Sequence, residues 1–243
     1  VAGLNASMAQ QIESLGSSVL FVRPFGPGEN LSREERRRRK GLTLAEVDAL
    51  AKRPEVRAIA ALEPLNVEVV KYGTQKLQSV AAFGATPAYE TVHDVYVDRG
   101  RFLSDGDVER AAKVVVLGAD VADALFPHLD PVGKEIFMDG RRFLVVGVME
   151  RKGKFLFISR DILMLVPLGS IQKKDPNFNF LVADLKPVTP ALLEAAVDQT
   201  RALLRRQRRL RYQDRDSFII FTQDTFTDLY RQLTGGIYLV MIA

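Results

Sequence analysis

Short apolar runs, each closed by a glycine or a turn sequence, fill the middle of the chain. Residues 114–117 read Val-Val-Val-Leu before a glycine, and residues 143–148 read Phe-Leu-Val-Val-Gly-Val. Runs of this length between turn signals predict buried strands. Asp139-Gly140 precedes the second run, and such a pair suits a tight hairpin because both turn positions need positive φ. We therefore expect a compact antiparallel β unit over residues 114–148.

Helical periodicity appears on both sides of this segment. Thr43 and Glu46 have the spacing of a capping box, in which each side chain satisfies a free backbone N–H. The helix that follows is predicted to bury one apolar face: Leu44, Val47, Leu50 and Ala51. A short helix is expected over 120–126. Thr189-Pro190 resembles a cap with proline at the first helical position, before a long helix with an apolar face: Leu193, Ala196, Val197, Thr200 and Leu204.

The remaining apolar runs predict strands that come before and after these helices. They cover residues 19–22, 56–62, 66–72, 76–83, 162–166, 178–185 and 218–221. Two strand–helix–strand halves thus flank a β-rich middle. Right-handed crossovers would let the halves share one sheet, as in split βαβ folds. The predicted class is α+β, a discontinuous α/β domain with a β-rich domain inserted into it.

Both ends of the chain have features of a membrane-anchored segment. Residues 3–15 show the spacing of an amphipathic helix. Residues 235–243 are almost wholly apolar, about half the length that a spanning helix needs, and Tyr230, Arg231 and Gln232 before them suit a membrane interface. We interpret the chain as a loop domain that leads into a transmembrane helix. A buried terminal helix or strand is the alternative.

Composition excludes several kinds of chemistry. The 243 residues are 47% apolar and 26% charged, as in ordinary globular domains. Without cysteine there is no disulfide, no thiol catalysis and no cysteine-ligated metal. The two histidines, His93 and His128, lack metal-binding spacing, which favours turn or surface positions over a metal site. No cofactor is expected in this domain.

Enzymatic catalysis has little support in the sequence. The carboxylate pairs Asp105/Asp107 and Asp214/Asp216 lie in polar turns, where turn and capping roles are favoured. Glycosidases need two carboxylates about 5–9 Å apart across a cleft. There is also no G-x-S-x-G motif and no phosphate-binding loop. An extracytoplasmic carbohydrate-active enzyme that uses Asp105 or Asp107 remains the alternative from another class.

Arginine is concentrated in two clusters, and the net charge is +4. Nucleic-acid binding would require aromatic residues among the arginines, but only Tyr212 lies within a cluster. A solvated helix face is therefore favoured over nucleic acid, with anionic lipid headgroups as a third possibility. The two clusters are residues 36–40 and, further along, Arg201, Arg205, Arg206, Arg208, Arg209, Arg211 and Arg215.

The order of these motifs resembles the extracytoplasmic domain of MacB-type ABC transporter permeases. The central part runs Val-Val-Leu-Gly, Leu-Phe, Pro-Val-Gly-Lys-x-Ile and Phe-x-Val-Val-Gly-Val. Further matches occur at residues 11–22, 42–47, 54–56, 100–105 and 166–168. The arginine-rich residues 33–40 are not part of the family pattern.

The resemblance implies a fold and a location. The fold would be a Porter-like α/β domain, residues 19–87 and 169–223, around a β-rich Sabre-like domain, residues 88–168. Residues 1–18 would form a juxtamembrane helix, and residues 224–243 a helix that leads into a truncated transmembrane segment. The domain would face the periplasm or extracytoplasmic space from the cytoplasmic (inner) membrane.

The resemblance also implies a mechanism and partners. A cytoplasmic ATPase on a separate segment or subunit would drive motion of a dimeric permease, and this non-catalytic domain would transmit the motion to a substrate or partner outside the membrane. The predicted type of transporter is an efflux pump. A lipoprotein-release permease and a regulator of a cell-wall hydrolase are the alternatives. The expected partners are the ATPase, a second permease, and a periplasmic adaptor or hydrolase, with no nucleic acid.

Two segments are predicted to contact the substrate or partner. One is an exposed apolar loop, and exposed apolar patches mark interaction sites. The other is the first arginine cluster. The residues are Phe155, Leu156 and Phe157 in the loop, and Arg36, Arg37, Arg38 and Arg39 in the cluster.

Overall fold

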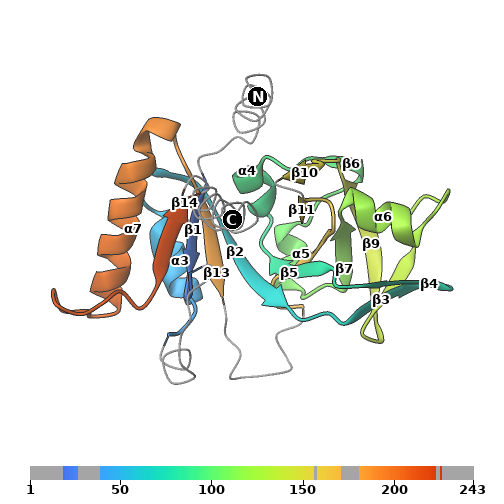
Figure 1. The fold of residues 1–243 in the computed structure, drawn as a ribbon, viewed down its shortest axis with the longest axis horizontal. Coiled ribbons are helices and arrows are strands. Elements are labelled where there is room, and N and C mark those ends of the chain that lie inside the picture. Colours follow the sequence, from blue (N-terminus) through green and yellow to red (C-terminus); the bar gives the residue numbers. More distant parts are fainter. Residues whose placement is uncertain (1–18, 27–38, 156–157, 171–180, 223–224, 226–243) are drawn as a thin grey trace, which may run out of the picture. The chain divides into compact units, whose positions relative to one another are not determined.

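The computed structural model describes residues 19–26, 39–155, 158–170, 181–222 and 225 (Figure 1). The chain divides into two compact units. Unit 1 comprises the segments up to Ile59 and from Val182, and unit 2 comprises Ala60–Leu181. Within the described residues no helix is long and apolar enough to cross a membrane. The predicted juxtamembrane helix and, apart from residue 225, the predicted C-terminal segment lie outside the described residues.

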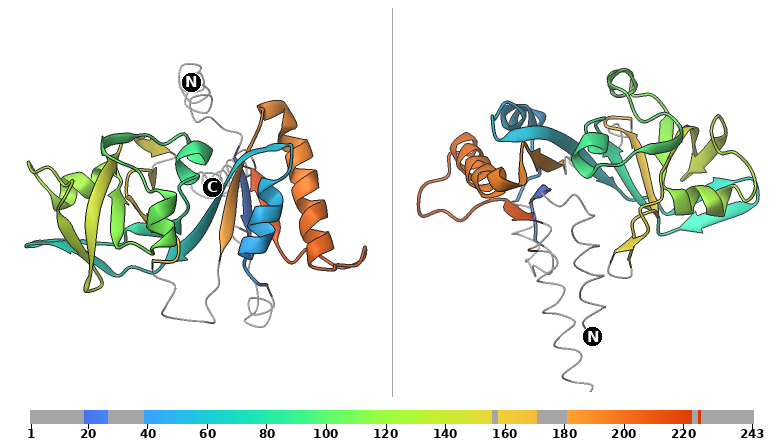
Figure 2. Two further views of the ribbon diagram at one scale, coloured as in Figure 1. Left: turned by 180° about the vertical axis from the view of Figure 1, so that it is seen from behind. Right: turned by 90° about the horizontal axis from the view of Figure 1, so that it is seen from above.

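Unit 1 is a four-stranded sheet with helices α3 and α7 on one face (Figures 1 and 2). The strand order is β14-β1-β13-β2, and β1 runs antiparallel to both β13 and β14. This is the split βαβ arrangement that the sequence predicts. The bounds are β1 Leu20–Arg23, α3 Leu44–Ala51, β2 Val56–Leu65, β13 Val182–Pro187, a 3-10 turn Pro190–Leu192, α7 Leu193–Gln207 and β14 Ile219–Thr222.

Helix α3 begins with the predicted capping box. The Thr43 hydroxyl accepts a hydrogen bond from the Glu46 backbone N–H at 3.1 Å, and the Glu46 carboxylate accepts one from the Thr43 N–H at 2.7 Å. The predicted apolar face is wrong in part, because Leu44 is 55% exposed. The buried side chains are Glu46, Val47 and Leu50. A buried carboxylate replaces the expected leucine because Glu46 has a cationic partner.

Unit 2 is a mixed sheet that begins with the part of β2 from Ala60 onward and continues in the order β5-β12-β7-β9-β8-β3-β4, with β6 on β9. The strands are β3 Val69–Tyr72, β4 Gln75–Gln78, β5 Ala81–Ala85, β6 Val97–Gly100, β7 Val114–Leu117, β8 Glu135–Met138, β9 Arg141–Met149 and β12 Leu163–Pro167. A separate hairpin pairs β10 Lys154–Phe155 with β11 Ile158–Ser159. The helices are α4 Tyr89–His93, α5 Asp105–Glu109 and α6 Ala119–Leu125.

The prediction for the central segment is confirmed at its hairpin and wrong in one strand pair. Asp139 and Gly140 have φ of 46° and 76°, and they join the antiparallel strands β8 and β9. Strands β7 and β9, however, are parallel. Helix α6 and strand β8 lie between them in the chain, so the chain crosses over before β9 begins. Val121, Leu125 and Phe126 are buried, as predicted, and pack in the core with Leu117 and Phe143.

The boundary between the units differs from the predicted insert of residues 88–168. Unit 2 begins at Ala60, so residues 60–87 and 169–181 belong to it. Strand pairing explains the difference, because β3 pairs with β8 and β5 pairs with β12. Strand β2 also continues through Pro64, where the sequence predicts a break.

Candidate functional site

The predicted apolar loop belongs to a β-hairpin in unit 2. Phe155 pairs with Ile158, and Lys154 pairs with Ser159. Leu156 and Phe157, and the side chain of Phe155, lie outside what the structure describes. We call residues 151–161 the anchored hairpin and residues 155–157, the predicted contact residues, its tip; the described residues show how its base is fixed.

A buried carboxylate joins the two sides of this base. Asp161 is 3% exposed, and its two oxygens accept hydrogen bonds from the backbone N–H groups of Lys152 and Gly153, both at 2.8 Å. The Arg160 N–H donates to the Gly153 carbonyl at 3.0 Å. Hydrogen bonds to a charged acceptor are stronger than neutral ones. The base is therefore held by a charge-assisted network as well as by strand pairing.

A second set of contacts ties the hairpin to helix α6. The Arg151 guanidinium forms ion pairs with Asp120 and Asp123, which lie one helical turn apart on α6. The Ser159 hydroxyl donates to Asp120 at 2.6 Å. The hydrogen bond to Asp120 raises the pKa of Arg151 above its usual value. Both ends of the hairpin thus contact the same helix.

We expect Asp161→Ala to loosen the hairpin while unit 2 stays folded. Two backbone N–H groups would lose their acceptor, so their exchange with deuterium should become about tenfold faster or more. Hydrogen exchange followed by NMR at Lys152 and Gly153 measures this. Asp123→Ala is the control, because its exposed ion pair contributes little. Equal exchange in Asp161→Ala and the native chain would contradict the anchoring role of Asp161.

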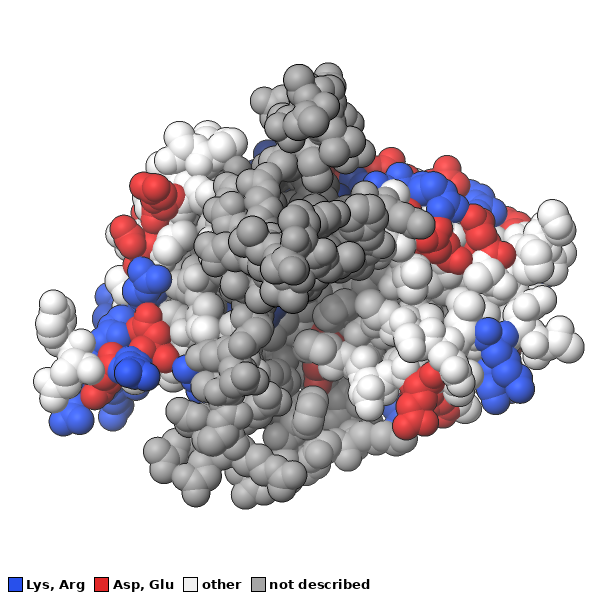
Figure 3. All heavy atoms as spheres, in the orientation of Figure 1, with Lys and Arg blue, Asp and Glu red and all other residues white. Residues whose placement is uncertain are grey.

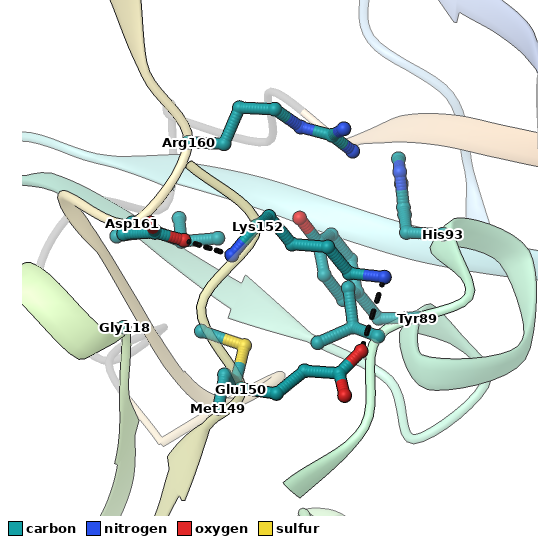
Figure 4. A pocket seen from close by; sticks show the side chains of 10 residues that line it. Tyr89, His93, Gly118, Met149, Glu150, Lys152, Arg160 and Asp161 are labelled. Carbon is teal, nitrogen blue, oxygen red and sulfur yellow. Dashed lines mark hydrogen bonds and ion pairs between the residues drawn. The ribbon is translucent and has the colours of Figure 1, made fainter. Parts of the chain in front are cut away.

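A small pocket of about 40 Å³ lies at the hairpin base. Tyr89 and His93 of α4 stack on each other there, with ring centroids 4.2 Å apart. Lys152 extends across the pocket to Glu150, at 3.3 Å, and Arg160 reaches the side where His93 lies (Figure 4). The sequence places His93 in a turn or on the surface. It gives no sign that α4 and the hairpin meet.

The first arginine cluster is only partly described. Arg36, Arg37 and Arg38 lie outside the described residues. Arg39 is half-buried, and its guanidinium donates to the Pro24 carbonyl at 3.3 Å. This contact joins two segments of unit 1, so Arg39 has a structural role whatever else it contacts.

Several arginines of the second cluster bind their own unit. Arg208 pairs with Glu46 at 2.7 Å, and Arg201 with Asp216 at 3.3 Å. Arg205 also pairs with Asp216 and donates to the Asp214 carbonyl. Blue and red side chains accordingly lie next to each other over the α7 part of unit 1 (Figure 3). This mixture of charges supports the helix-face interpretation over a nucleic-acid surface.

Asp105 and Asp107 begin helix α5. Asp107 is 3% exposed, pairs with Arg101 at 2.6 Å and forms a capping box with Ser104. The hydrogen bond from Arg101, helped by those from Ser104, outweighs burial and lowers the pKa of Asp107 to about 2. Such a group stays ionised and cannot act as a general acid. Within the described ranges no group of three or more potential ligands could hold a metal ion either.

Asp107→Asn should reveal this ion pair through pH. The pKa of Asp107 is lower in the folded state, so its contribution is complete above the unfolded value near 3.8 and is lost as the pH falls toward 2. We expect the free energy of unfolding to drop by about 1 kcal/mol at pH 7, since Arg101 is half exposed. Urea unfolding should show this deficit shrinking below about pH 4. Asp105→Asn, an exposed change in the same turn, serves as the control; a deficit independent of pH would exclude the ion pair as its source.

Comparisons with a family model and with known proteins point to the same family. The model of the MacB-like periplasmic core domain matches residues 1–203. The chain is 32% identical over 169 residues to the macrolide export ATP-binding/permease protein MacB of Rhodospirillum rubrum, which covers 68% of this chain and 25% of that protein. It is 33% identical over 155 residues to the pyoverdine export ATP-binding/permease protein PvdT of Pseudomonas savastanoi, covering 62% and 22%. The chain thus spans about a quarter of these relatives or less.

Solved structures share the fold. The periplasmic region of MacB from Actinobacillus actinomycetemcomitans superposes with a TM-score of 0.69 at 18% identity, over 90% of this chain and 95% of that one. The extracellular domain of the ABC-type transporter YknZ from Gram-positive bacteria gives 0.63 at 15% identity, over 84% and 99%. The predicted fold class is confirmed by these similarities.

Proposed function

Because the chain belongs to the MacB-like periplasmic core domain family, we propose that it is the extracytoplasmic domain of an ABC transporter permease in the inner membrane. In this proposal the domain is not catalytic. An ATPase on a separate segment or subunit hydrolyses ATP in the cytoplasm, and a permease dimer transmits the resulting motion to this domain. The family match over residues 1–203 supports this placement.

We further propose that the tip of the anchored hairpin contacts the substrate or partner protein. The observation that carries this step is the double attachment of its base. Asp161 joins its two sides, and Asp120 of α6 pairs with Arg151 and accepts a hydrogen bond from Ser159. A segment that transmits motion must move together with the unit that drives it. A loop with a loose base would absorb the displacement instead.

Export is the activity we favour, since relatives are named for the export of macrolides and pyoverdine. A periplasmic adaptor would then be the partner of the hairpin, and the arginines at 36–39 would provide a second contact. Lipoprotein release and regulation of a cell-wall hydrolase need the same relay of motion with a different partner. The protein that binds the tip therefore distinguishes these possibilities.

Replacing Phe155 and Phe157 with serine tests the contact. The double variant should fold normally and reach the membrane in the full-length permease, yet ATP-dependent export should fall at least several-fold, because buried aromatic residues dominate binding energy at interfaces. Circular dichroism of the chain and export from cells measure the two properties.

Leu129→Ser is the matched control. Leu129 is an exposed apolar residue of unit 2 in the loop after α6, away from the hairpin in sequence. This change should leave export unchanged. Normal export by the double serine variant at native protein levels would remove the hairpin tip from the contact surface, and loss of export in both variants would point to a nonspecific effect.

A further inference from the structure

We propose that the pocket at the base of the anchored hairpin binds a carboxylate group, and that Arg160 is the residue that pairs with it. The carboxylate would belong to the partner protein that the hairpin tip contacts. This choice of partner rests on the proposed function, whereas carboxylate binding by the pocket does not.

Arg160 is distinguished from the other charged groups of the pocket by its contacts. Lys152 pairs with Glu150 and also donates to the Asp94 carbonyl. The Asp161 carboxylate is occupied by backbone N–H groups. The half-buried Arg160 guanidinium, by contrast, has no hydrogen-bonding or ionic partner among the described residues. Among the described side chains that line the pocket, Arg160 therefore carries the positive charge that no carboxylate compensates.

The backbone of Arg160 is held in place, whereas its guanidinium is unpaired within the described part of the chain. Its N–H donates to Gly153, and the next residue is the buried Asp161. Figure 4 shows the guanidinium extending over the pocket toward the side occupied by His93. A donor group fixed at its backbone loses less conformational freedom when a ligand binds. Arg160 is therefore presented to the pocket by the same network that anchors the hairpin.

The size and charge of the pocket favour a carboxylate over other ligands. A volume of about 40 Å³ admits a small planar group, far below the roughly 300 Å³ of typical pockets for small molecules. A guanidinium matches a carboxylate with two parallel hydrogen bonds. Phosphate carries more negative charge than a carboxylate. It would be repelled more strongly by Glu150 and Asp161, and Arg160 alone would not balance its charge. A singly charged carboxylate fits this balance better.

The chain contains its own reporter for the test. His93 lines the pocket, and the only other histidine, His128, lies in the loop after α6 and does not line it. Two histidine ring signals are easily resolved by NMR, and His93→Gln assigns them. Titration with sodium acetate at constant pH and ionic strength should shift the His93 ring signals in a saturable way and leave those of His128 unchanged.

Variants and other probes make this titration decisive. Arg160→Gln should weaken acetate binding about tenfold or more, since it removes a charged donor, while Arg142→Gln on an exposed strand position should not. Acetamide, a neutral analogue, should give no saturable shift. The inference fails if acetate causes no saturable shift of His93, or the same shift in Arg160→Gln. Tighter binding of inorganic phosphate than of acetate would overturn the choice of carboxylate.

The failure of this inference can be told apart from the failure of the proposed function. Arg160→Gln in the full-length permease should reduce export, and Phe157→Ser should leave acetate binding intact. If the tip variant loses export but the native chain does not bind acetate, the carboxylate site is excluded and the hairpin contact is still supported. If the native chain binds acetate but Arg160→Gln exports normally, the carboxylate does not belong to the partner protein.

Discussion

Arg208→Ala is expected to lower the free energy of unfolding of unit 1 by about 3 kcal/mol. The Arg208 guanidinium donates to both oxygens of Glu46, at 2.7 and 3.2 Å, and to the Gly41 carbonyl at 3.1 Å. It also donates to the Ser217 hydroxyl at 3.0 Å. Its removal would leave the Glu46 carboxylate, at 7% exposure, without a cation. An unpaired buried charge costs far more than the loss of an exposed pair.

The pH dependence of the variant identifies the cause. Burial raises the pKa of Glu46, but hydrogen bonds from Arg208 and Thr43 outweigh it, so the folded pKa lies below the ordinary value of 4.5. The pair therefore stabilises the fold above that value, and its contribution is lost as the pH falls through the folded pKa. The deficit of Arg208→Ala should accordingly shrink in acid.

Urea unfolding followed by circular dichroism measures this deficit, because the chain has no tryptophan. Hydrogen exchange in α3 and α7 assigns the loss to unit 1. Arg206→Ala is the matched control, an exposed arginine in the last turn of α7, two residues before Arg208, and should change stability by less than about 0.5 kcal/mol. Similar deficits in the two variants would show that the buried pair is not what stabilises unit 1.

Gly118→Ala should destabilise unit 2 by about 3 kcal/mol. Gly118 has φ of −70°, which alanine adopts without strain. A Cβ atom there would nevertheless lie 2.2 Å from the Asp161 carbonyl oxygen and 3.0 Å from that of Leu163. Both contacts are with backbone, so no side chain can rotate away. The segment that carries Asp161 would have to move, and with it the hairpin base.

Gly140→Ala is the comparison variant. It measures the cost of placing alanine at a positive φ without any steric clash. Gly140 has φ of +76°, but nothing lies within 4 Å of an added Cβ. Its replacement should cost about 1 to 2 kcal/mol through the left-handed backbone alone. Urea unfolding should thus rank Gly118→Ala as the more harmful change despite its ordinary φ. The reverse ranking would show that the segment at Asp161 can adjust.

Local sequence patterns predicted the features of this chain that depend on a few neighbouring residues. The Asp139-Gly140 turn forms because both residues tolerate positive φ. The capping box forms because Thr43 and Glu46 are three residues apart. The inward side chains of the short helix at Val121 and Leu125 follow from helical spacing alone.

The predictions that were wrong depended on partners distant in sequence. Leu44 was expected inside and is exposed, since Glu46 meets Arg208, 162 residues away, on the buried face. Strands β7 and β9 were expected to be antiparallel and are parallel. Distant pairing likewise explains why the compact unit 2 begins at Ala60, since β3 and β5 pair with strands later in the chain.

The candidate site shows the same division. The sequence by itself determined the family and an apolar segment at residues 155–157, because these are properties of adjacent residues. Only the tertiary structure placed Asp161 across the base of that segment, joined Arg151 to α6 and brought His93 near Arg160. Such contacts join elements whose distance depends on the pairing of the whole sheet, and spacing along one chain does not encode that distance.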